Sequence, residues 1–400
     1  MRVLALGGAG AMGVHACRTV AKVHEDAELI VADLDAERAA EVAAGLGDRA
    51  RSIGLDVTDA AALTEAIRRA DVVMNTVGPF FRFGVPILRA AIEQGRDYVD
   101  ICDDWEPTVE MLGLNEAAKA AGSTALVGMG ASPGVSNLLA VSAARELDRV
   151  DEIITGWDLT TGGLDVASTP GVPSAAVVHA IEQITGTIRV TRGGRPVDEP
   201  ALRRTRLDYP GVGRRTAWTF GHPEALTMPA AFPSVTTSLN VAFGDPATIA
   251  GLRVIRAAVD RRLVSARRAA LIAERVDRWS SAKPAFRGRR LPPLFGLAIG
   301  ARHGEPASVG CALAQIPGGL TMGEVTGIPL GVAIGLLAGA RPGVGTPETL
   351  LDPGDVYAAL APHCIGDPDP ASMVVTTRSW EAHAAADLHD ALDRARALLV

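Results

Sequence analysis

The stretch MRVLALGGAGAMGVHACRTVAKVHEDAELIVADLD, residues 1–35, decides the fold of this chain. An apolar run, Val3 to Leu6, leads directly into a glycine-rich segment, and an alanine-rich segment with helical spacing follows. A second apolar run, Leu29 to Ala32, ends on Asp33. The order of strand, glycine turn, helix, strand and acid is typical of a dinucleotide-binding βαβ unit.

Gly8, Gly10 and Gly13 fill the glycine positions of the pattern G-x-G-x-x-G, and Asp33 lies 20 residues after the last of them. We expect Gly8 to permit a tight turn, Gly10 to let a pyrophosphate approach the backbone, and Gly13 to let the helix pack closely on the sheet. The helix N-terminus offers free N–H groups and a positive dipole end to phosphates. The alternative is an ordinary βα turn that binds nothing.

Asp33 also bears on which dinucleotide is bound. A carboxylate can accept hydrogen bonds from both ribose hydroxyls, but it repels the 2′-phosphate of NADP, which usually needs a nearby arginine. The first cation after Asp33 is Arg38. The sequence therefore favours NAD(H), and NADP(H) remains possible if Arg38 turns toward the ribose.

The composition indicates a globular protein of two or three domains. The chain has 400 residues, 48% of them hydrophobic and 21% charged, with a net charge of −7, so no nucleic-acid surface is expected. The four cysteines form no C-x-x-C pair, so neither a disulfide framework nor a metal site is expected, and a cytoplasmic location fits. Residues 325–340 are uncharged but contain Pro329 and are too short for a membrane span, and no signal peptide precedes the first strand.

Strand-like and helix-like segments alternate through the first 130 residues, which predicts a doubly wound parallel sheet. Ligands of such sheets bind beyond the carboxyl ends of the strands. We therefore expect Asp56 and Val57 near the adenine and residues 75–80 near the nicotinamide. The next strand, 97–101, ends in an acidic turn that contains Asp103.

The pattern changes near residue 150, where an α+β domain with a mostly antiparallel sheet is expected. We expect an exposed strand over 151–159, a polar connection over 192–215, a helix over 254–279, and a hairpin over 298–315 that turns at 303–305. Residues 327–337 and 382–399 are expected to be helices. The predicted domains are 1–135, 136–322 and 323–400.

Several motifs resemble the saccharopine dehydrogenase family: GGAGAMG at 7–13, DVVMNTVGPF at 71–80, GRDYVDICDD at 95–104, GASPGVSN at 130–137, GHPEALTMP at 221–229 and TGIPLGVAIGLLAG at 326–339. The resemblance implies a Rossmann domain, an inserted α+β domain, and a C-terminal segment that packs back on the first domain. It also implies a nicotinamide-dependent reaction at a C–N bond, in which an amine and an oxo acid or aldehyde are joined through an imine, or the reverse. A homodimer is expected from the same resemblance.

The candidate cofactor-binding residues combine the motif positions with those that the resemblance implies. They are Gly8, Gly10, Ala11, Met12, Gly13, Asp33, Leu34, Asp56, Val57, Asn75, Thr76, Gly78 and Pro79.

The candidate catalytic residues are Asp103, Asp100 and His222. A carboxylate beside the substrate would favour the protonated imine, which accepts hydride best, and an acidic turn suits an amine substrate; the alternative is a solvated loop. We hypothesise this role for Asp103, with Asp100 as a second candidate. His222 lies in the turn Gly221-His222-Pro223-Glu224 and can exchange a proton near neutral pH, although it could also bond its own loop.

Candidate substrate contacts are Phe80, Cys102, Arg214 and Arg215. Either arginine would bind a substrate carboxylate through two hydrogen bonds. Cys102 is interpreted as a lining residue and not as a nucleophile, because no histidine partner is placed beside it. Two other functions stay open: a reductase of a C=C or C=O bond, and a non-catalytic protein that binds a dinucleotide.

Overall fold

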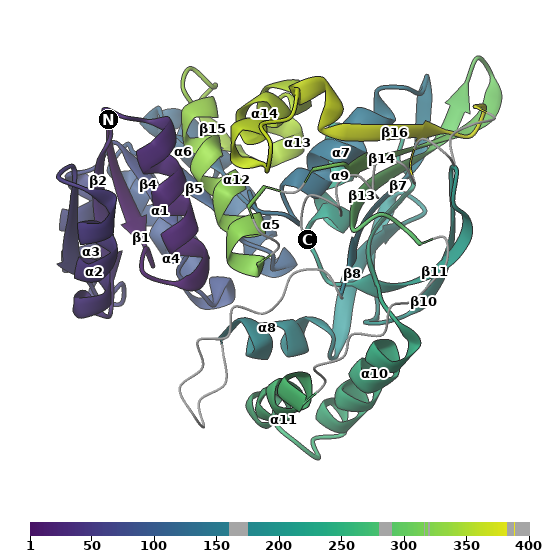
Figure 1. The fold of residues 1–400 in the computed structure, drawn as a ribbon, viewed down its shortest axis with the longest axis horizontal. Coiled ribbons are helices and arrows are strands. Elements are labelled where there is room, and N and C mark those ends of the chain that lie inside the picture. Colours follow the sequence, from purple (N-terminus) through teal and green to yellow (C-terminus); the bar gives the residue numbers. More distant parts are fainter. Residues whose placement is uncertain (160–174, 280–289, 316, 319–320, 382–387, 389–400) are drawn as a thin grey trace. The chain divides into compact units, whose positions relative to one another are not determined.

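The computed structural model describes the chain except for residues 160–174, 280–289, 316, 319–320, 382–387 and 389–400 (Figure 1). The described residues form two compact units. The first unit holds Met1–Val141 and Ala314–Val374, and the second holds Ser142–Leu313 and the described residues from Val375 to Leu388. The predicted terminal helix over 382–399 lies outside the described residues, apart from Leu388.

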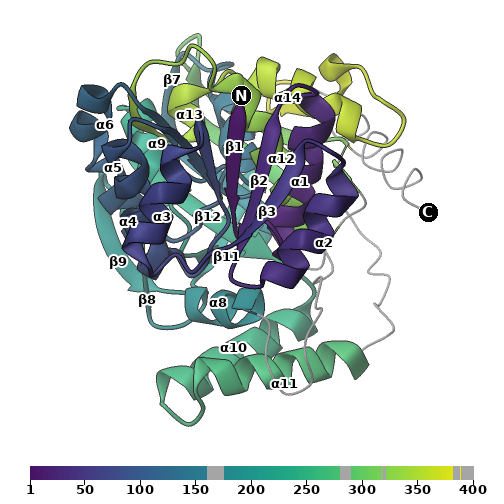
Figure 2. The ribbon, with the colours of Figure 1, turned by 90° about the vertical axis from the view of Figure 1, so that its left-hand side faces the viewer.

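The first unit is built on a parallel sheet. Its strands are β1 (Arg2–Leu6), β2 (Glu28–Asp33), β3 (Ala50–Gly54), β4 (Val72–Asn75), β5 (Asp97–Asp100), β6 (Thr124–Leu126) and β15 (Gly343–Gly345). Within the described parts of the chain the order is β15-β6-β5-β4-β1-β2-β3, and each neighbouring pair is parallel. Figure 2 shows β1, β2 and β3 as neighbours. The doubly wound parallel sheet predicted from the sequence is confirmed.

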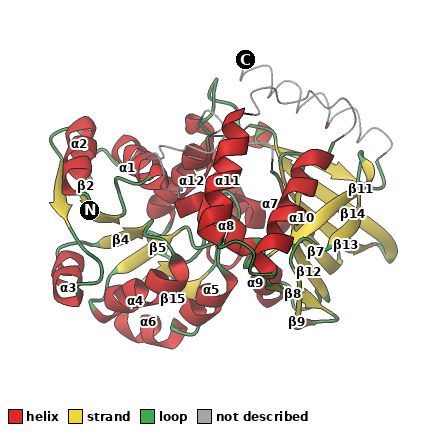
Figure 3. Cartoon of the chain, turned by 90° about the horizontal axis from the view of Figure 1, so that it is seen from below, coloured by secondary structure: helices red, strands yellow, loops and turns green. Residues whose placement is uncertain are grey.

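Helices cover both faces of this sheet. The helices in this part of the chain are α1 (Ala11–Val23), α2 (Ala36–Leu46), α3 (Ala60–Arg68), α4 (Phe80–Glu93), α5 (Trp105–Leu112), α6 (Asn115–Ala121), α7 (Val135–Ala144), α12 (Met322–Leu336), α13 (Pro347–Leu350) and α14 (Pro353–Leu360). Figure 3 shows α1, α2 and α12 on one face and α3, α4 and α6 on the other. The apolar side chains of β1, β2 and β4 are therefore buried on both sides, which explains why these strands are nearly continuous hydrophobic runs.

The C-terminal part of the first unit returns to its beginning through α12. A Cβ atom at Gly327 would lie 2.4 Å from the Met12 carbonyl oxygen, and one at Gly331 would lie 2.8 Å from the Ala16 carbonyl oxygen. These glycines let the backbone of α12 approach the backbone of α1. The expected return of a C-terminal segment to the first domain therefore holds for α12.

The segment that follows does not return in the same way. Strand β16 (Val374–Arg378) joins the sheet of the second unit beside β14 (Glu305–Leu313). The expectation that all of 323–400 packs on the first domain is therefore wrong for residues 375–381. An isolated strand leaves all of its backbone groups without partners in a sheet, and pairing with β14 satisfies those on one side.

The second unit contains a mixed sheet. Its further strands are β7 (Arg149–Asp158), β8 (Thr187–Arg192), β9 (Arg195–Pro200), β10 (Arg204–Tyr209), β11 (Gly213–Phe220), β12 (Thr237–Phe243) and β13 (Leu294–Arg302). Strands β7 and β12 are parallel, whereas β10–β11, β11–β12, β7–β13 and β13–β14 are antiparallel pairs. The expected α+β unit with a mostly antiparallel sheet is confirmed.

Three local expectations for this unit are wrong. The segment 192–215 holds β9 and β10 and is not an irregular connection. The segment 254–279 holds the end of α10 (Pro246–Asp260) and all of α11 (Ala266–Trp279), which are separated where Arg262 has a φ of 58°. Strand β7 lies inside the sheet between β12 and β13, so it is largely buried and not exposed.

The remaining helices of the second unit are α8 (Ala175–Gln183) and α9 (Glu224–Ala231). A search of the described residues finds no helix with the length and apolar character needed to cross a membrane.

Candidate dinucleotide site

The glycine turn after β1 has the geometry of a phosphate-binding loop, with one change from the expectation. The residue with positive φ is Gly7, at 71°, and not Gly8. A Cβ atom at Gly8 would instead lie 2.9 Å from the Ala5 carbonyl oxygen. Gly7 therefore permits the tight turn, and Gly8 permits close packing on the strand.

Gly10 and Gly13 differ in what surrounds them. A Cβ atom at Gly13 would lie 2.2 Å from the Gly7 carbonyl oxygen and 2.8 Å from the Gly8 Cα atom. At Gly10 the single neighbour within 4 Å would be the Gly7 carbonyl oxygen, at 3.1 Å. Gly13 is thus required for the fold of the turn, whereas Gly10 leaves its outer side open for a ligand, as the motif predicts.

The N-terminus of α1 is available to an anion. Gly10 is its N-cap residue, and no side chain caps the helix. In contrast, α2 and α3 are capped by the carboxylates of Asp35 and Asp59. The first-turn N–H groups of a helix, here from Ala11 onward, have no intrahelical acceptor. A phosphate at this point would receive these hydrogen bonds and the positive end of the helix dipole.

Asp33, the last residue of β2, is tied to the glycine turn. Its Oδ2 atom accepts a hydrogen bond from the Ala9 N–H at 3.2 Å, and its Oδ1 atom accepts one from the Asp35 N–H at 3.2 Å. Each carboxylate oxygen has a further lone pair, so ribose hydroxyls can still be bound. The neighbouring Leu34 side chain is 76% exposed and offers an apolar surface beside it.

The predicted adenine contacts follow β3. Asp56 is exposed, and its Oδ1 atom accepts hydrogen bonds from both the backbone N–H and the hydroxyl of Thr58. These hydrogen bonds lower the pKa of Asp56, which is therefore anionic at neutral pH. Val57 is half-buried.

The loop after β4 is fixed to the glycine turn. The hydroxyl of Thr76 lies 3.0 Å from the carbonyl oxygens of Leu6 and Gly7, to which it donates. Gly78 is exposed and Pro79 is half-buried at the start of α4, so both lie at the carboxyl edge of the sheet as expected. Phe80, in contrast, is buried in the hydrophobic core, which favours a packing role over the expected contact with substrate.

Asp100, the last residue of β5, is completely buried and its carboxylate is held by three donors. They are the hydroxyl of Tyr98 at 2.8 Å, the N–H of Cys102 at 3.0 Å and the N–H of Gly128 at 2.8 Å. Burial raises the pKa of Asp100 to about 6. This geometry gives Asp100 no exposed oxygen for a substrate, so the structure favours a structural role over the predicted catalytic one.

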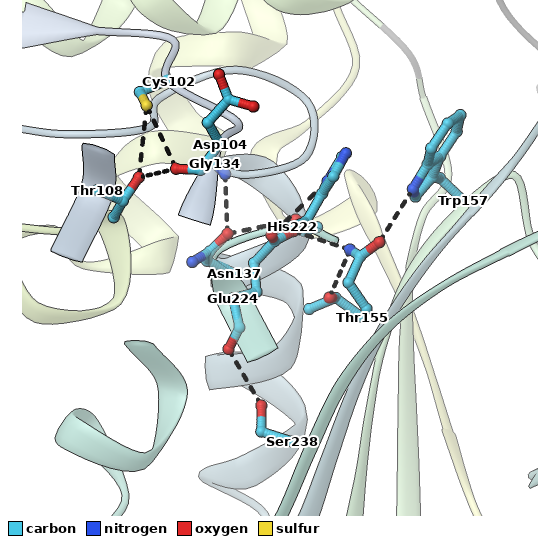
Figure 4. Close-up of polar contacts among 12 residues, drawn as sticks. Cys102, Asp104, Thr108, Gly134, Asn137, Thr155, Trp157, His222, Glu224 and Ser238 are labelled. Atoms are coloured by element: carbon cyan, nitrogen blue, oxygen red, sulfur yellow. Dashed lines mark hydrogen bonds and ion pairs between the residues drawn. The ribbon is translucent and has the colours of Figure 1, made fainter. Parts of the chain in front are cut away.

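Cys102 and Asp103 follow Asp100 in the acidic turn. The Cys102 thiol accepts a hydrogen bond from the Thr108 hydroxyl at 3.5 Å, and burial raises its pKa well above the usual value (Figure 4). Cys102 is therefore a buried thiol and not a nucleophile. Asp103 is half-buried, and its charge contributes to the raised pKa of Asp100. Asp103 remains the candidate carboxylate of this turn.

His222 belongs to the second unit, where it joins a buried polar cluster (Figure 4). Its side chain is 5% exposed, and its Nδ1 atom lies 3.8 Å from the Glu224 Oε2 atom. The imidazole ring stacks on Trp157 with 5.7 Å between ring centroids. Glu224 Oε1 accepts a hydrogen bond from Asn240, which also donates to Thr155.

This cluster fixes the orientation of His222 and places a carboxylate beside it, an arrangement suited to proton transfer. Sequence reasoning missed Glu224, Asn240 and Thr155. A signal was present in the apolar strand 237–243, where Asn240 interrupts the hydrophobic run. A buried amide in a central strand needs several hydrogen-bond partners.

Arg214 and Arg215 are not brought together with His222. They lie at the start of β11, whereas His222 follows its end, so extended backbone of roughly 20 Å separates them. The Arg214 side chain is 86% exposed and pairs with Asp208 at 3.6 Å. Arg215 donates to the Arg214 carbonyl oxygen. Within this unit neither arginine belongs to the His222 cluster.

The parallel sheet, the uncapped start of α1 and the acid at the end of β2 define the first unit as a Rossmann-type dinucleotide-binding domain. Residues 3–126 match the family model described as the saccharopine dehydrogenase NADP binding domain. Over these residues the match confirms the resemblance predicted from the sequence.

Curated relatives match the same region. A trans-acting enoyl reductase of Mycobacterium leprae is 33% identical over 102 residues, which is 25% of this chain and 24% of the relative. The saccharopine dehydrogenase [NADP(+), L-glutamate-forming] of Schizosaccharomyces pombe is 29% identical over 114 residues, 28% of this chain and 24% of the relative. The chain thus spans about a quarter of the length of the curated relatives that it matches.

A solved structure extends the likeness to the second unit. Saccharopine dehydrogenase (L-Glu forming) from Saccharomyces cerevisiae aligns over 90% of this chain and 96% of its own, with a TM-score of 0.55 and 16% identity. At this identity the likeness shows the fold alone.

Proposed function

We propose that the chain is a nicotinamide-dependent oxidoreductase whose first unit holds the dinucleotide. The observation that carries this proposal is the glycine turn: Gly10 leaves open space at an uncapped helix start, and Asp33 lies beside the turn. Bound there, the dinucleotide supplies or accepts the hydride. The chain's own residues bind and orient the two reactants and hold the protons.

We propose NAD(H) as the preferred cofactor. The Asp33 carboxylate is fixed by backbone N–H groups, so it cannot swing away from a 2′-phosphate without losing them. The matching family is described as NADP-binding, and Arg38 in the first turn of α2 is the cation available to reverse the preference. Titrating both reduced cofactors decides between them.

The reaction that we propose is the reductive joining of an amine to an oxo acid or aldehyde through an imine, or the reverse. The resemblance to saccharopine dehydrogenases and the fold likeness over both units support it. In this scheme Asp103 stabilises a protonated imine nitrogen by its charge, and His222 exchanges a proton through its imidazole.

The test is a turnover screen in which oxidation of NADH and NADPH is followed with pairs of amines and oxo acids. We expect turnover with at least one pair, and we expect the Asp103→Asn variant to lose most of it while binding the cofactor unchanged. Unchanged turnover in this variant would rule out the role of Asp103.

The mycobacterial relatives supply a second candidate, an enoyl reductase. An α,β-unsaturated thioester in the same screen tests it: oxidation with the thioester and with none of the amine pairs would replace the C–N proposal. Cofactor binding without turnover of any substrate class would favour a non-catalytic dinucleotide-binding protein.

A further inference from the structure

A buried chain of hydrogen bonds joins the loops that follow β4, β5 and β6. It begins at the Asp100 carboxylate, which accepts from the Cys102 N–H in the loop after β5 and from the Gly128 N–H in the loop after β6. The other carboxylate oxygen accepts from the Tyr98 hydroxyl at 2.8 Å. One side chain thus holds two loops that are distant in sequence.

The same chain of hydrogen bonds reaches the loop after β4. Asn75 donates from its Nδ2 atom to the Tyr98 hydroxyl oxygen at 2.9 Å, and its Oδ1 atom accepts from the Val77 N–H at 2.9 Å. Asn75, Tyr98 and Asp100 are each fully buried. The backbone positions of Val77, Cys102 and Gly128 therefore depend on one connected set of side chains.

A buried carboxylate holds these loops at a cost in folding free energy. Among the described residues, no arginine, lysine or histidine forms an ion pair with Asp100, and burying an unpaired carboxylate costs free energy. Neutral side chains would fix a purely structural loop at a lower cost. A buried carboxylate at this position is explained if the loops must keep one backbone conformation in order to bind a ligand.

The order of the strands indicates which part of a bound dinucleotide would lie over the loops that Asp100 holds. The pyrophosphate site lies after β1, and Asp33, after β2, lies on the side where the adenine ribose would bind. A dinucleotide lies across the carboxyl ends of the strands at the point where the strand order reverses. Its other half must then extend over β4 and β5, where the loops held by Asp100 lie.

We infer that Asp100 is a positioning residue for the nicotinamide half of the bound dinucleotide, acting through the backbone of the loops after β4, β5 and β6. This inference rests on the proposed function, because it requires that the first unit binds a dinucleotide. Asp100 itself touches neither reactant.

The test compares Asp100→Asn with a matched control, Asp97→Asn. Asp97 begins the same strand, and its carboxylate accepts the Thr124 N–H from the neighbouring strand at 2.8 Å, but at the opposite edge of the sheet. Each variant loses a carboxylate that holds backbone. Calorimetric titration at pH 8 measures two affinities for each protein: that for the preferred reduced dinucleotide, and that for its adenine half, ADP-ribose or 2′-phospho-ADP-ribose.

We expect Asp100→Asn to weaken binding of the whole dinucleotide about tenfold, with the affinity for the adenine half unchanged, and Asp97→Asn to change neither. Equal loss for both ligands, or no loss, would overturn the inference and leave Asp100 a structural residue. A wild-type protein that binds no dinucleotide would overturn the proposed function as well.

Tyr98→Phe tests the same point in a variant that removes a single oxygen atom. It breaks the connection between Asp100 and Asn75 while it keeps both N–H bonds to the carboxylate. We expect a smaller loss, confined again to the whole dinucleotide. If Asp100→Asn fails to fold, unchanged dinucleotide affinity in Tyr98→Phe contradicts the inference.

Discussion

At the scale of single residues, Gly10 and Gly13 belong to one motif but meet different surroundings. We predict that Gly10→Ala loses less stability than Gly13→Ala but loses dinucleotide affinity by about tenfold or more, because the added methyl group meets one backbone atom, the Gly7 carbonyl oxygen at 3.1 Å, and otherwise occupies the space left for the ligand. Gly13→Ala should be destabilised by about 1–3 kcal/mol, because its methyl group meets backbone atoms. Urea unfolding and dinucleotide titration of both variants check this. Equal losses of stability in the two variants would contradict it.

Asp33 is predicted to control the choice between the cofactors. Asp33→Asn removes the negative charge but keeps a side chain that can bond the ribose. We expect the ratio of NADPH to NADH affinity to rise about tenfold, because the repulsion of the 2′-phosphate is relieved. Titration of both cofactors against the variant and the wild type measures this ratio, and an unchanged ratio would show that Asp33 does not set it.

Asp100 gives the stability of the chain a predictable pH dependence. Burial, with a smaller contribution from the charge of Asp103, raises the pKa of Asp100 to about 6, despite the hydrogen bonds that lower it. An unfolded aspartate titrates near ~3.9. The folded chain therefore binds the proton more tightly, so the stability that this group contributes is present at low pH and is lost as the pH rises from about 4 to about 6.

The measurement for this prediction is urea unfolding of the wild type and of Asp100→Asn at several pH values. Subtraction of the two unfolding free energies removes the titration of the other groups. We expect the advantage of the wild type to be larger at low pH than at neutral pH. A difference that grows with pH would mean that Asp100 is stabilised as an anion.

At the scale of elements, the packing of α12 on α1 depends on small residues. Gly327→Ala should destabilise the chain by about 1–3 kcal/mol, because its Cβ atom would lie 2.4 Å from the Met12 carbonyl oxygen. The control is Gly45→Ala in α2, where no atom lies within 4 Å of the new Cβ atom. That variant should gain about 0.5–1 kcal/mol. Destabilisation of both variants to the same extent would show that close approach is not the cause.

Sequence patterns predicted the elements of the first unit well because its strands are short apolar runs separated by helices with clear ends. These patterns did not indicate where a helix is interrupted or where it begins. The residue pattern predicts one helix over 108–121, but the structure divides it into α5 and α6 near Gly113. The pattern also predicts a helix that starts at Val85, whereas α4 begins five residues earlier, at Phe80. In the second unit, β9 and β10 consist largely of charged and polar residues and proline, so these strands have no hydrophobic pattern to reveal them.

Over the full length of the chain, the sequence pattern indicates the location of a cofactor site more directly than it indicates the chemistry. The glycine turn and Asp33 are close in sequence, so their spacing alone indicates a site. The connections of Asp100 to Gly128 and of Glu224 to Asn240 join residues distant in sequence, and single-sequence periodicity carries no information about such contacts. The roles of Asp103 and His222 remain predictions because they depend on the substrate.

Both the proposed function and the role inferred for Asp100 require that the first unit binds a nicotinamide dinucleotide at the glycine turn. Calorimetric titration of the full chain and of its Gly10→Ala variant with NADH and with NADPH measures this binding. We predict saturable binding to one site, tighter for NADH, and at least about tenfold weaker binding in the variant. No binding of either cofactor, or equal binding by the variant, would contradict it.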